Sequence, residues 1–227
     1  MFTNCEKAAD FIPVDIAINV MIVAAWKTAQ NQQNLMPPIY NVTSGEIKPL
    51  TWGEIEEYGI KSVYNYPVES VMWYPGGSFK NNAFHDRVSR WLFHYLPAYL
   101  IDALLAIFWR KPFMIRLVNK MTKSIDALQY FTTNEWSWSN ANVAKLHQDL
   151  VETDPQSLKD FDFDIKSLNW RNFFENYVLG TRHYVLKNSP TSMEASKKKM
   201  RLLGFLHFTL QFVFGMFMIY KIYTAIY

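Results

Sequence analysis

Three aspartates at alternate positions are the first candidates for chemistry in this sequence. Asp160, Asp162 and Asp164 have the spacing of the first three ligands of an EF-hand calcium loop. That loop then needs glycine at its sixth position and glutamate at its twelfth, where this chain has Ile165 and Arg171. We therefore expect no calcium site. We expect instead an extended segment with these apolar side chains packed inward: Phe161, Phe163 and Ile165.

Histidine and cysteine offer little more. His94 and Asp102 could form an acid–base pair, but Pro97 lies between them and leaves their geometry open, so a structural hydrogen bond or no pairing at all is the expectation. The single cysteine, Cys5, excludes an internal disulfide framework and a four-cysteine zinc site. The histidines form no H-E-x-x-H motif and no i, i+4 pair, so we expect no metal site. They are His85, His94, His147, His183 and His207.

Motifs for nucleotides and nucleophiles are also missing from the sequence. It contains no G-x-G-x-x-G, no Walker pattern and no G-x-S-x-G elbow. Gly76-Gly77, inside Tyr74–Ser78, is typical of a turn between domains rather than of a phosphate loop. We assign no catalytic, cofactor-binding or metal-binding residue to this chain.

Composition indicates a folded chain with a large core. Half of the 227 residues are hydrophobic and 17% are aromatic, which argues against disorder. The net charge is only +3, and the basic residues are scattered except for one cluster near the C-terminus, which argues against nucleic acid as a partner.

The first third of the chain has the pattern of an α/β sheet domain. Asp15 is expected to cap an apolar helix, Ile16–Gln30, and 39–43 to form a short buried strand. Thr51 and Glu54 make the capping box of another helix. One or two strands cannot make a stable doubly wound sheet. The expected fold class is therefore an α+β fragment, in which the last elements of a sheet domain precede helices.

The middle of the chain has a helical pattern. Residues 87–108 are strongly apolar, and Pro97 should kink or split that helix. A second helix opens at Lys111-Pro112 with an apolar stripe to Leu128. We hypothesise that 91–108 and 113–128 cover an acyl chain or meet a membrane surface, although a plain helical core would have the same pattern.

Two further helices are expected before the C-terminal segment. Asn140 can cap a short helix to Leu150. A longer one follows Ser167 or Asn169 as cap, with Arg182 away from its apolar face. That face comprises Trp170, Phe173, Phe174, Tyr177, Val178, Tyr184 and Val185.

The C-terminal segment has the length and composition of a transmembrane helix. Leu202–Tyr220 contains no formal charge, and a helix of that length spans roughly 28 Å. Basic residues cluster just before it, at 197–201, as they do on the cytoplasmic flank of a span. We expect a single-pass tail anchor with the body of the chain in the cytosol. The alternative is a buried or interfacial helix, because Thr209 and Gln211 weaken the span.

Several segments, taken together and in order, resemble the C-terminal half of animal, insect-type, alcohol-forming fatty acyl-CoA reductases, including the end of their Rossmann domain. They cover nearly the whole chain. The matching stretches are Phe11–Asp15, Tyr40–Glu46, Thr51–Glu54, Trp73–Gly77, Leu92–Asp102, Tyr130–Trp136 and Phe174–Gly180.

This resemblance implies an extended short-chain dehydrogenase fold, a helical C-terminal domain and a membrane tail. Such enzymes reduce long-chain fatty acyl-CoA with NADPH, through an aldehyde, to a primary alcohol. Their Gly-rich turn and Tyr-x-x-x-Lys pair have no match here, so the NADPH site is expected to precede Met1. The implied parts are 1–75 (Rossmann remnant), 76–188 (helical domain), 189–201 (basic linker), 202–220 (transmembrane helix) and 221–227 (tail).

Two explanations of the missing half remain open. The sequence is either a fragment of a full reductase, which the truncated sheet favours, or a genuine short product. As a fragment it shares the family's lipid metabolism but is expected to be inactive alone. As a short product it would be a membrane-tethered, non-catalytic acyl-binding or interaction module. In both cases the expected location is the membrane of the peroxisome or endoplasmic reticulum.

Overall fold

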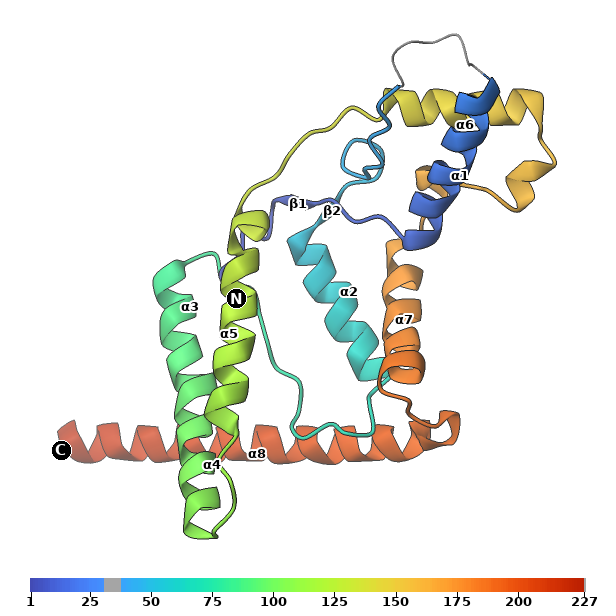
Figure 1. The fold of residues 1–227 in the computed structure, drawn as a ribbon. Coiled ribbons are helices and arrows are strands. Elements are labelled where there is room, and N and C mark those ends of the chain that lie inside the picture. The colour runs from blue at the N-terminus through green and yellow to red at the C-terminus, as the bar shows by residue number, and fades with distance from the viewer. Residues whose placement is uncertain (31–37, 227) are drawn as a thin grey trace. The chain divides into compact units, whose positions relative to one another are not determined.

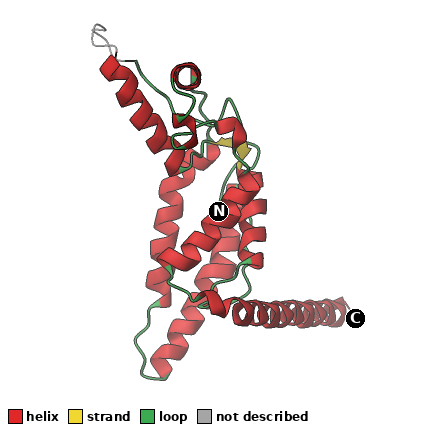
Figure 2. Ribbon diagram, turned by 90° about the vertical axis from the view of Figure 1, so that its right-hand side faces the viewer, coloured by secondary structure: helices red, strands yellow, loops and turns green. Residues whose placement is uncertain are grey.

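The structure is a computed structural model that describes residues 1–30 and 38–226. It is mostly helical, with one small sheet and one long C-terminal helix (Figures 1 and 2). The chain divides into two compact units, each interrupted in sequence. Unit 1 comprises 1–55 and 78–168, and unit 2 comprises 56–77 and 169–227. One boundary falls directly after Gly77, at the turn that the sequence indicates.

The main core of unit 1 lies between α1 (Val14–Gln30) and α6 (Ala141–Thr153). The prediction that Asp15 caps the helix from outside is wrong, because α1 begins at Val14 and Asp15 lies in its first turn. The inward packing predicted for Phe163 and Ile165 is confirmed, because both are fully buried in this cluster. Its buried members are Ile16, Val20, Val23, Val143, Leu146, Leu150, Phe163 and Ile165.

The strand predicted at 39–43 is wrong. Tyr40 and Val42 do pack against the core, but the described part of this stretch has no strand alongside to pair with. Side chains use its neighbourhood instead: the Asn41 amide donates to the Ser139 carbonyl at 3.0 Å. The Asn142 amide donates to the Ile39 carbonyl at 2.7 Å. The apolar pattern therefore reports burial against α6, not membership of a sheet.

The one sheet among the described residues is minimal. Strand β1 (Ala8–Ala9) pairs antiparallel with β2 (Leu50–Thr51), with Ala8 opposite Thr51. Helix α2 (Trp52–Asn65) begins directly afterwards. The predicted capping box is confirmed, since the Glu54 carboxylate accepts the Thr51 N–H at 2.8 Å and the Thr51 hydroxyl accepts the Glu54 N–H at 3.2 Å.

A helical hairpin forms the other part of unit 1 (Figure 1). Helix α3 (Ala83–Arg90) continues through a π-helical turn, Trp91–Tyr95, into α4 (Leu96–Ile107), and α5 (Met114–Thr133) packs back along α4. At the position where a kink or split was expected from Pro97, the helix continues through this π-helical turn, in which the Leu96 N–H donates to the Trp91 carbonyl. Such a turn makes room for a proline, which can neither donate nor fit a tight helix interior.

Unit 2 contains most of α2, together with α7 (Trp170–Gly180), a π-helical turn (Thr181–Val185) and α8 (Met193–Ile226). Asn169 caps α7 by accepting the Asn172 N–H at 3.1 Å. The predicted apolar face holds for Trp170 and Phe174, which are buried, but Tyr184 and Val185 are exposed. Short 3-10 turns lie at Ser157–Lys159, Ile165–Ser167 and Pro190–Ser192.

Candidate membrane-anchoring site

The structure does not bring His94 and Asp102 together as an acid–base pair. Both Asp102 carboxylate oxygens point across the hairpin turn to the first amides of α5. They accept the backbone N–H groups of Phe113, Met114 and Ile115, each at 2.9 Å. Burial of Asp102 opposes its charge, but these three hydrogen bonds outweigh that effect and hold the pKa of the carboxyl below its usual value. Asp102 is a structural staple between α4 and α5.

The described residues contain no nucleotide-binding turn. A nucleotide-binding fold needs a Gly-rich turn between a strand and a helix, and the two strands described here are two residues each. Gly76 and Gly77 lie in a loop with open space around them. Among residues 1–30 and 38–226, no three His, Cys, Asp or Glu side chains gather as metal ligands. The described residues therefore do not fit NADPH.

An aromatic pocket of about 270 Å³ lies in unit 1 beside the small sheet. Its one acidic residue is Asp10. The Asp10 carboxylate accepts hydrogen bonds from the Ser44 N–H at 2.7 Å and the Ser44 hydroxyl at 3.2 Å, so it has a structural role. The remaining lining offers apolar contact but no acid–base pair. Its aromatic members are Phe11, Trp52, Phe131, Trp136 and Trp138.

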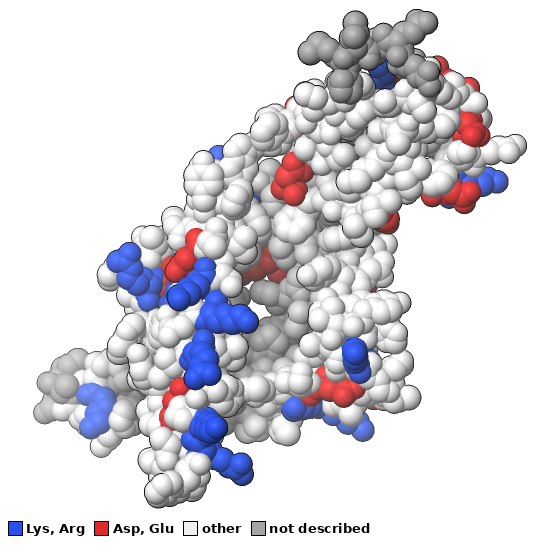
Figure 3. All heavy atoms as spheres, in the orientation of Figure 1, with Lys and Arg blue, Asp and Glu red and all other residues white. Residues whose placement is uncertain are grey.

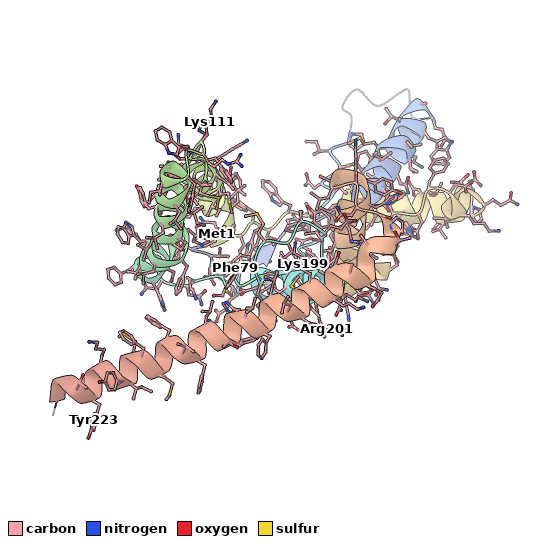
Figure 4. The ribbon with its side chains drawn as sticks, turned by 90° about the horizontal axis from the view of Figure 1, so that it is seen from below. Met1, Phe79, Lys111, Lys199, Arg201 and Tyr223 are labelled. Atoms are coloured by element: carbon pink, nitrogen blue, oxygen red, sulfur yellow. The ribbon has the colours of Figure 1, made fainter. Side chains whose placement is uncertain are left out.

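Helix α8 is the most distinctive feature of unit 2. It runs for 34 residues, about 50 Å at the usual helical rise, and its apolar segment is long enough to cross a membrane. It begins at Met193, before the predicted start of the span, so the basic cluster lies on the helix itself. Figure 4 shows Lys199 and Arg201 toward one end of α8 and Tyr223 at the other. Large apolar side chains between them are exposed, among them Phe205, Phe212, Phe214, Met216 and Phe217.

Aromatic side chains from the loop that follows α2, which is also part of unit 2, contact the start of this apolar segment. The Trp73 indole N–H donates to His207 Nδ1 at 3.2 Å, and the Tyr74 ring stacks on His207 with centroids 5.6 Å apart. Gly204 lets Tyr74 approach, because a Cβ there would lie 3.0 Å from the ring. Trp and Tyr favour the membrane–water interface, where one end of the ring is apolar and the other wet. We call these residues, 73–74 with 204–208, the aromatic seat.

A buried arginine fastens the turn that leads into α8. Arg182, predicted to face away from the core, is only 4% exposed. Its Nε donates to the Pro67 carbonyl at 3.2 Å and its guanidinium also donates to the Ser192 hydroxyl. Hydrogen bonds from Ser192 and from the Ser189 N–H hold the pKa of nearby Glu69 below its usual value. The prediction failed because helical spacing was continued through a π-helical turn, where an extra residue rotates the face.

The sequence alone identified the span and its basic flank but missed the seat and the arginine brace. Trp73 and Tyr74 occur in a Pro-Gly-Gly turn, and nothing in that motif indicates a contact with a helix more than 100 residues later. The one available signal is the glycine at 204 on an otherwise bulky helix face, which is typical of a close approach.

The fold and site define a helical domain that carries a candidate C-terminal membrane helix. Comparison with known proteins makes this specific. The family described as "Sterile: Male sterility protein" matches residues 93–188, from the π-helical turn before α4 to the turn after α7. The chain is 31% identical to the fatty acyl-CoA reductase wat of Drosophila melanogaster over 223 residues, covering 98% of this chain and 42% of the relative.

The chain is also similar to fatty acyl-CoA reductases of vertebrates. The chain is 33% identical to human fatty acyl-CoA reductase 1 over 198 residues, covering 86% of the chain and 37% of the relative. It is 31% identical to the rat fatty acyl-CoA reductase 1 over 204 residues, covering 89% and 39%. The chain belongs to the fatty acyl-CoA reductase family, which confirms the resemblance seen in the sequence. It spans about two fifths of the length of the curated relatives it matches.

Proposed function

We propose that this chain serves the NADPH-dependent reduction of long-chain fatty acyl-CoA to primary fatty alcohol as the membrane-anchored C-terminal part of a reductase. The observation that carries the proposal is the continuous match of nearly the whole chain to fatty acyl-CoA reductases. The described residues offer no site for NADPH, so the nucleotide and the hydride transfer belong to sequence outside this chain.

Within that proposal each part of the chain has a role. Residues 1–75 complete the nucleotide-binding domain, 76–188 form the helical domain, and 189–201 lead into the span. Helix α8 anchors the protein, with 202–220 in the bilayer and 221–227 beyond it. The basic residues of its first turns support a cytosolic body. The host membrane is that of the peroxisome or endoplasmic reticulum.

The experiment compares two reading frames in cells that make no fatty alcohol of their own. One is this chain alone, and the other is the full frame read from the native transcript upstream of Met1. Fatty alcohols are measured in lipid extracts by mass spectrometry. We expect alcohol from the longer frame only.

A closed frame directly upstream of Met1, or a longer frame that makes no alcohol, overturns the proposal. The chain would then be a membrane-tethered, non-catalytic acyl-binding or interaction module. Membrane recovery of both products after alkaline extraction separates a lost anchor from a missing catalytic half.

A further inference from the structure

The turn of the α4–α5 hairpin carries an exposed apolar cluster. We define the hairpin tip as residues 104–113, which comprise the end of α4, the turn and the residue before α5. Trp109 is 97% exposed and Phe108 is 72% exposed. Trp109 also has a φ of 57°, a left-handed conformation that is costly for a bulky side chain. The other exposed large apolar side chains of the tip are Leu104, Ile107 and Phe113.

These side chains are not the core stripe of the hairpin. The buried residues of α4 are Ala98 and Asp102, and the one buried residue in the first turns of α5 is Val118. Large residues of α4 such as Leu100 and Leu104 face outward. A contiguous apolar patch of this kind marks a surface that contacts a partner or a membrane.

The charge around the tip selects the partner. Between Ala103 and Ile125 the chain has five basic residues and no acidic one, although its overall net charge is only +3. Figure 3 shows Lys and Arg side chains in a row along the hairpin. Apolar and aromatic side chains flanked by exposed cations are typical of segments that bind anionic lipid surfaces. The five are Arg110, Lys111, Arg116, Lys120 and Lys123, and all are exposed.

Most backbone N–H groups of the tip have a partner within the chain, which favours entry into lipid. An N–H without a partner is costly in an apolar layer, so a segment that enters lipid must satisfy its own donors. At the end of α4, Trp109 donates to the Ala106 carbonyl and Arg110 to the Leu105 carbonyl. At the start of α5, Asp102 satisfies three successive amides, and Pro112 has no N–H to satisfy.

We propose that the hairpin tip inserts shallowly into a lipid bilayer with anionic headgroups, as a membrane contact separate from α8. Trp109, Phe108 and Ile107 enter the boundary between headgroups and acyl chains, roughly 5–10 Å deep. Arg110 and Lys111 directly follow Trp109 and keep their charged ends at the phosphates, which prevents the tip from crossing. The proposal does not depend on the reductase activity.

The test places an environment-sensitive NBD fluorophore at the tip of the full chain in proteoliposomes. Cys5, the single cysteine, is replaced by serine, and Trp109→Cys is labelled. The matched control is Lys145→Cys, an exposed position on α6 of the same unit. Circular dichroism verifies that both labelled proteins remain folded. Vesicles contain either phosphatidylcholine alone or phosphatidylcholine with phosphatidylserine, and carry lipid quenchers at shallow or deep positions.

We expect a blue-shifted emission at position 109, quenched several-fold more by shallow than by deep quenchers, and no quenching at position 145. Phosphatidylserine should increase the inserted fraction, and Arg110→Gln with Lys111→Gln should reverse that increase. Emission typical of water at position 109 overturns the proposal. So does a blue shift that lipid quenchers do not affect, which would mean cover by protein. Quenching mainly from the bilayer centre overturns the shallow insertion, and equal insertion with and without phosphatidylserine overturns the anionic lipid.

Discussion

The carboxylate of Asp102 accepts the backbone N–H of Ile115 at 2.9 Å, across the turn that joins α4 to α5. The same carboxylate accepts the two preceding amides, so one side chain caps the start of α5 from the neighbouring helix. No residue of α5 or of its own turn supplies a side-chain cap there. Asp102 therefore fixes the start of α5 against α4.

Replacing Asp102 should loosen the start of α5. Asp102→Ala removes all three hydrogen bonds, whereas Asp102→Asn keeps one acceptor oxygen. We expect the amides of 113–115 to exchange with deuterium several-fold faster in Asp102→Asn and faster still in Asp102→Ala. Asp160→Asn, at an exposed aspartate of the same unit, is the control and should leave these amides unchanged. Unchanged protection in Asp102→Ala would show that the staple is dispensable.

The staple also predicts a dependence on pH. The pKa of Asp102 is lower in the folded chain than its ordinary value of 3.8. Its contribution to stability is therefore complete above pH of about 3.8 and is lost as the pH falls through the lower, folded pKa. The amides of 113–115, corrected for intrinsic exchange, should stay protected just below pH 3.8 and lose protection in more acidic solution. Asp102→Asn should show no such transition in this range.

Arg182 should be among the most sensitive positions of unit 2. Arg182→Met leaves the buried Pro67 carbonyl without its donor, which costs about 1–3 kcal/mol. Arg171→Met is the matched control, because the side chain of Arg171 is 56% exposed and its ion pair with Glu175 contributes little. We expect a lower urea midpoint for Arg182→Met in detergent micelles, measured by circular dichroism. Equal midpoints for the two variants would contradict the brace.

Two glycines of α8 provide a matched pair for the aromatic seat. A side chain at Gly204 collides with Tyr74, whereas Gly215 has open space around it. Gly204→Leu should displace Tyr74 from Tyr64, on which it stacks at 5.2 Å, at a cost of about 1–3 kcal/mol. Deuterium exchange across 64–75 should rise in Gly204→Leu and stay at the wild-type level in Gly215→Leu. Faster exchange in Gly215→Leu than in Gly204→Leu would contradict the packing of Tyr74 against α8 at Gly204.

Charge in the middle of α8 should prevent membrane integration. Phe212→Arg with Val213→Arg places two cations near the centre of the span, each unfavourable by about 2.5–3.5 kcal/mol. Ala195→Arg adds the same side chain to an exposed position before the span and is the control. In alkaline extraction we expect the control in the membrane pellet and the double variant in the supernatant. Retention of the double variant would favour the interfacial-helix alternative for α8.

Local patterns predicted the elements whose causes are local. The Thr51–Glu54 capping box and the Asn169 cap depend on neighbours within a few residues, and the structure confirms both. The strand at 39–43 failed for the converse reason. A strand requires a partner from elsewhere in the chain, and its apolar alternation is equally satisfied by packing on a helix.

The sequence by itself determined the family, the mostly helical character that follows the first third of the chain, and the long apolar helix with its basic flank. These follow from composition, periodicity and short-range motifs, which a single stretch of chain contains in full. Only the tertiary structure decided that Asp102 caps another helix, that Arg182 is buried, and that Trp73 and Tyr74 meet His207. Each of these depends on which distant segments lie together, because hydrogen bonds and ring contacts act over a few ångströms in space and leave no periodic trace along the chain.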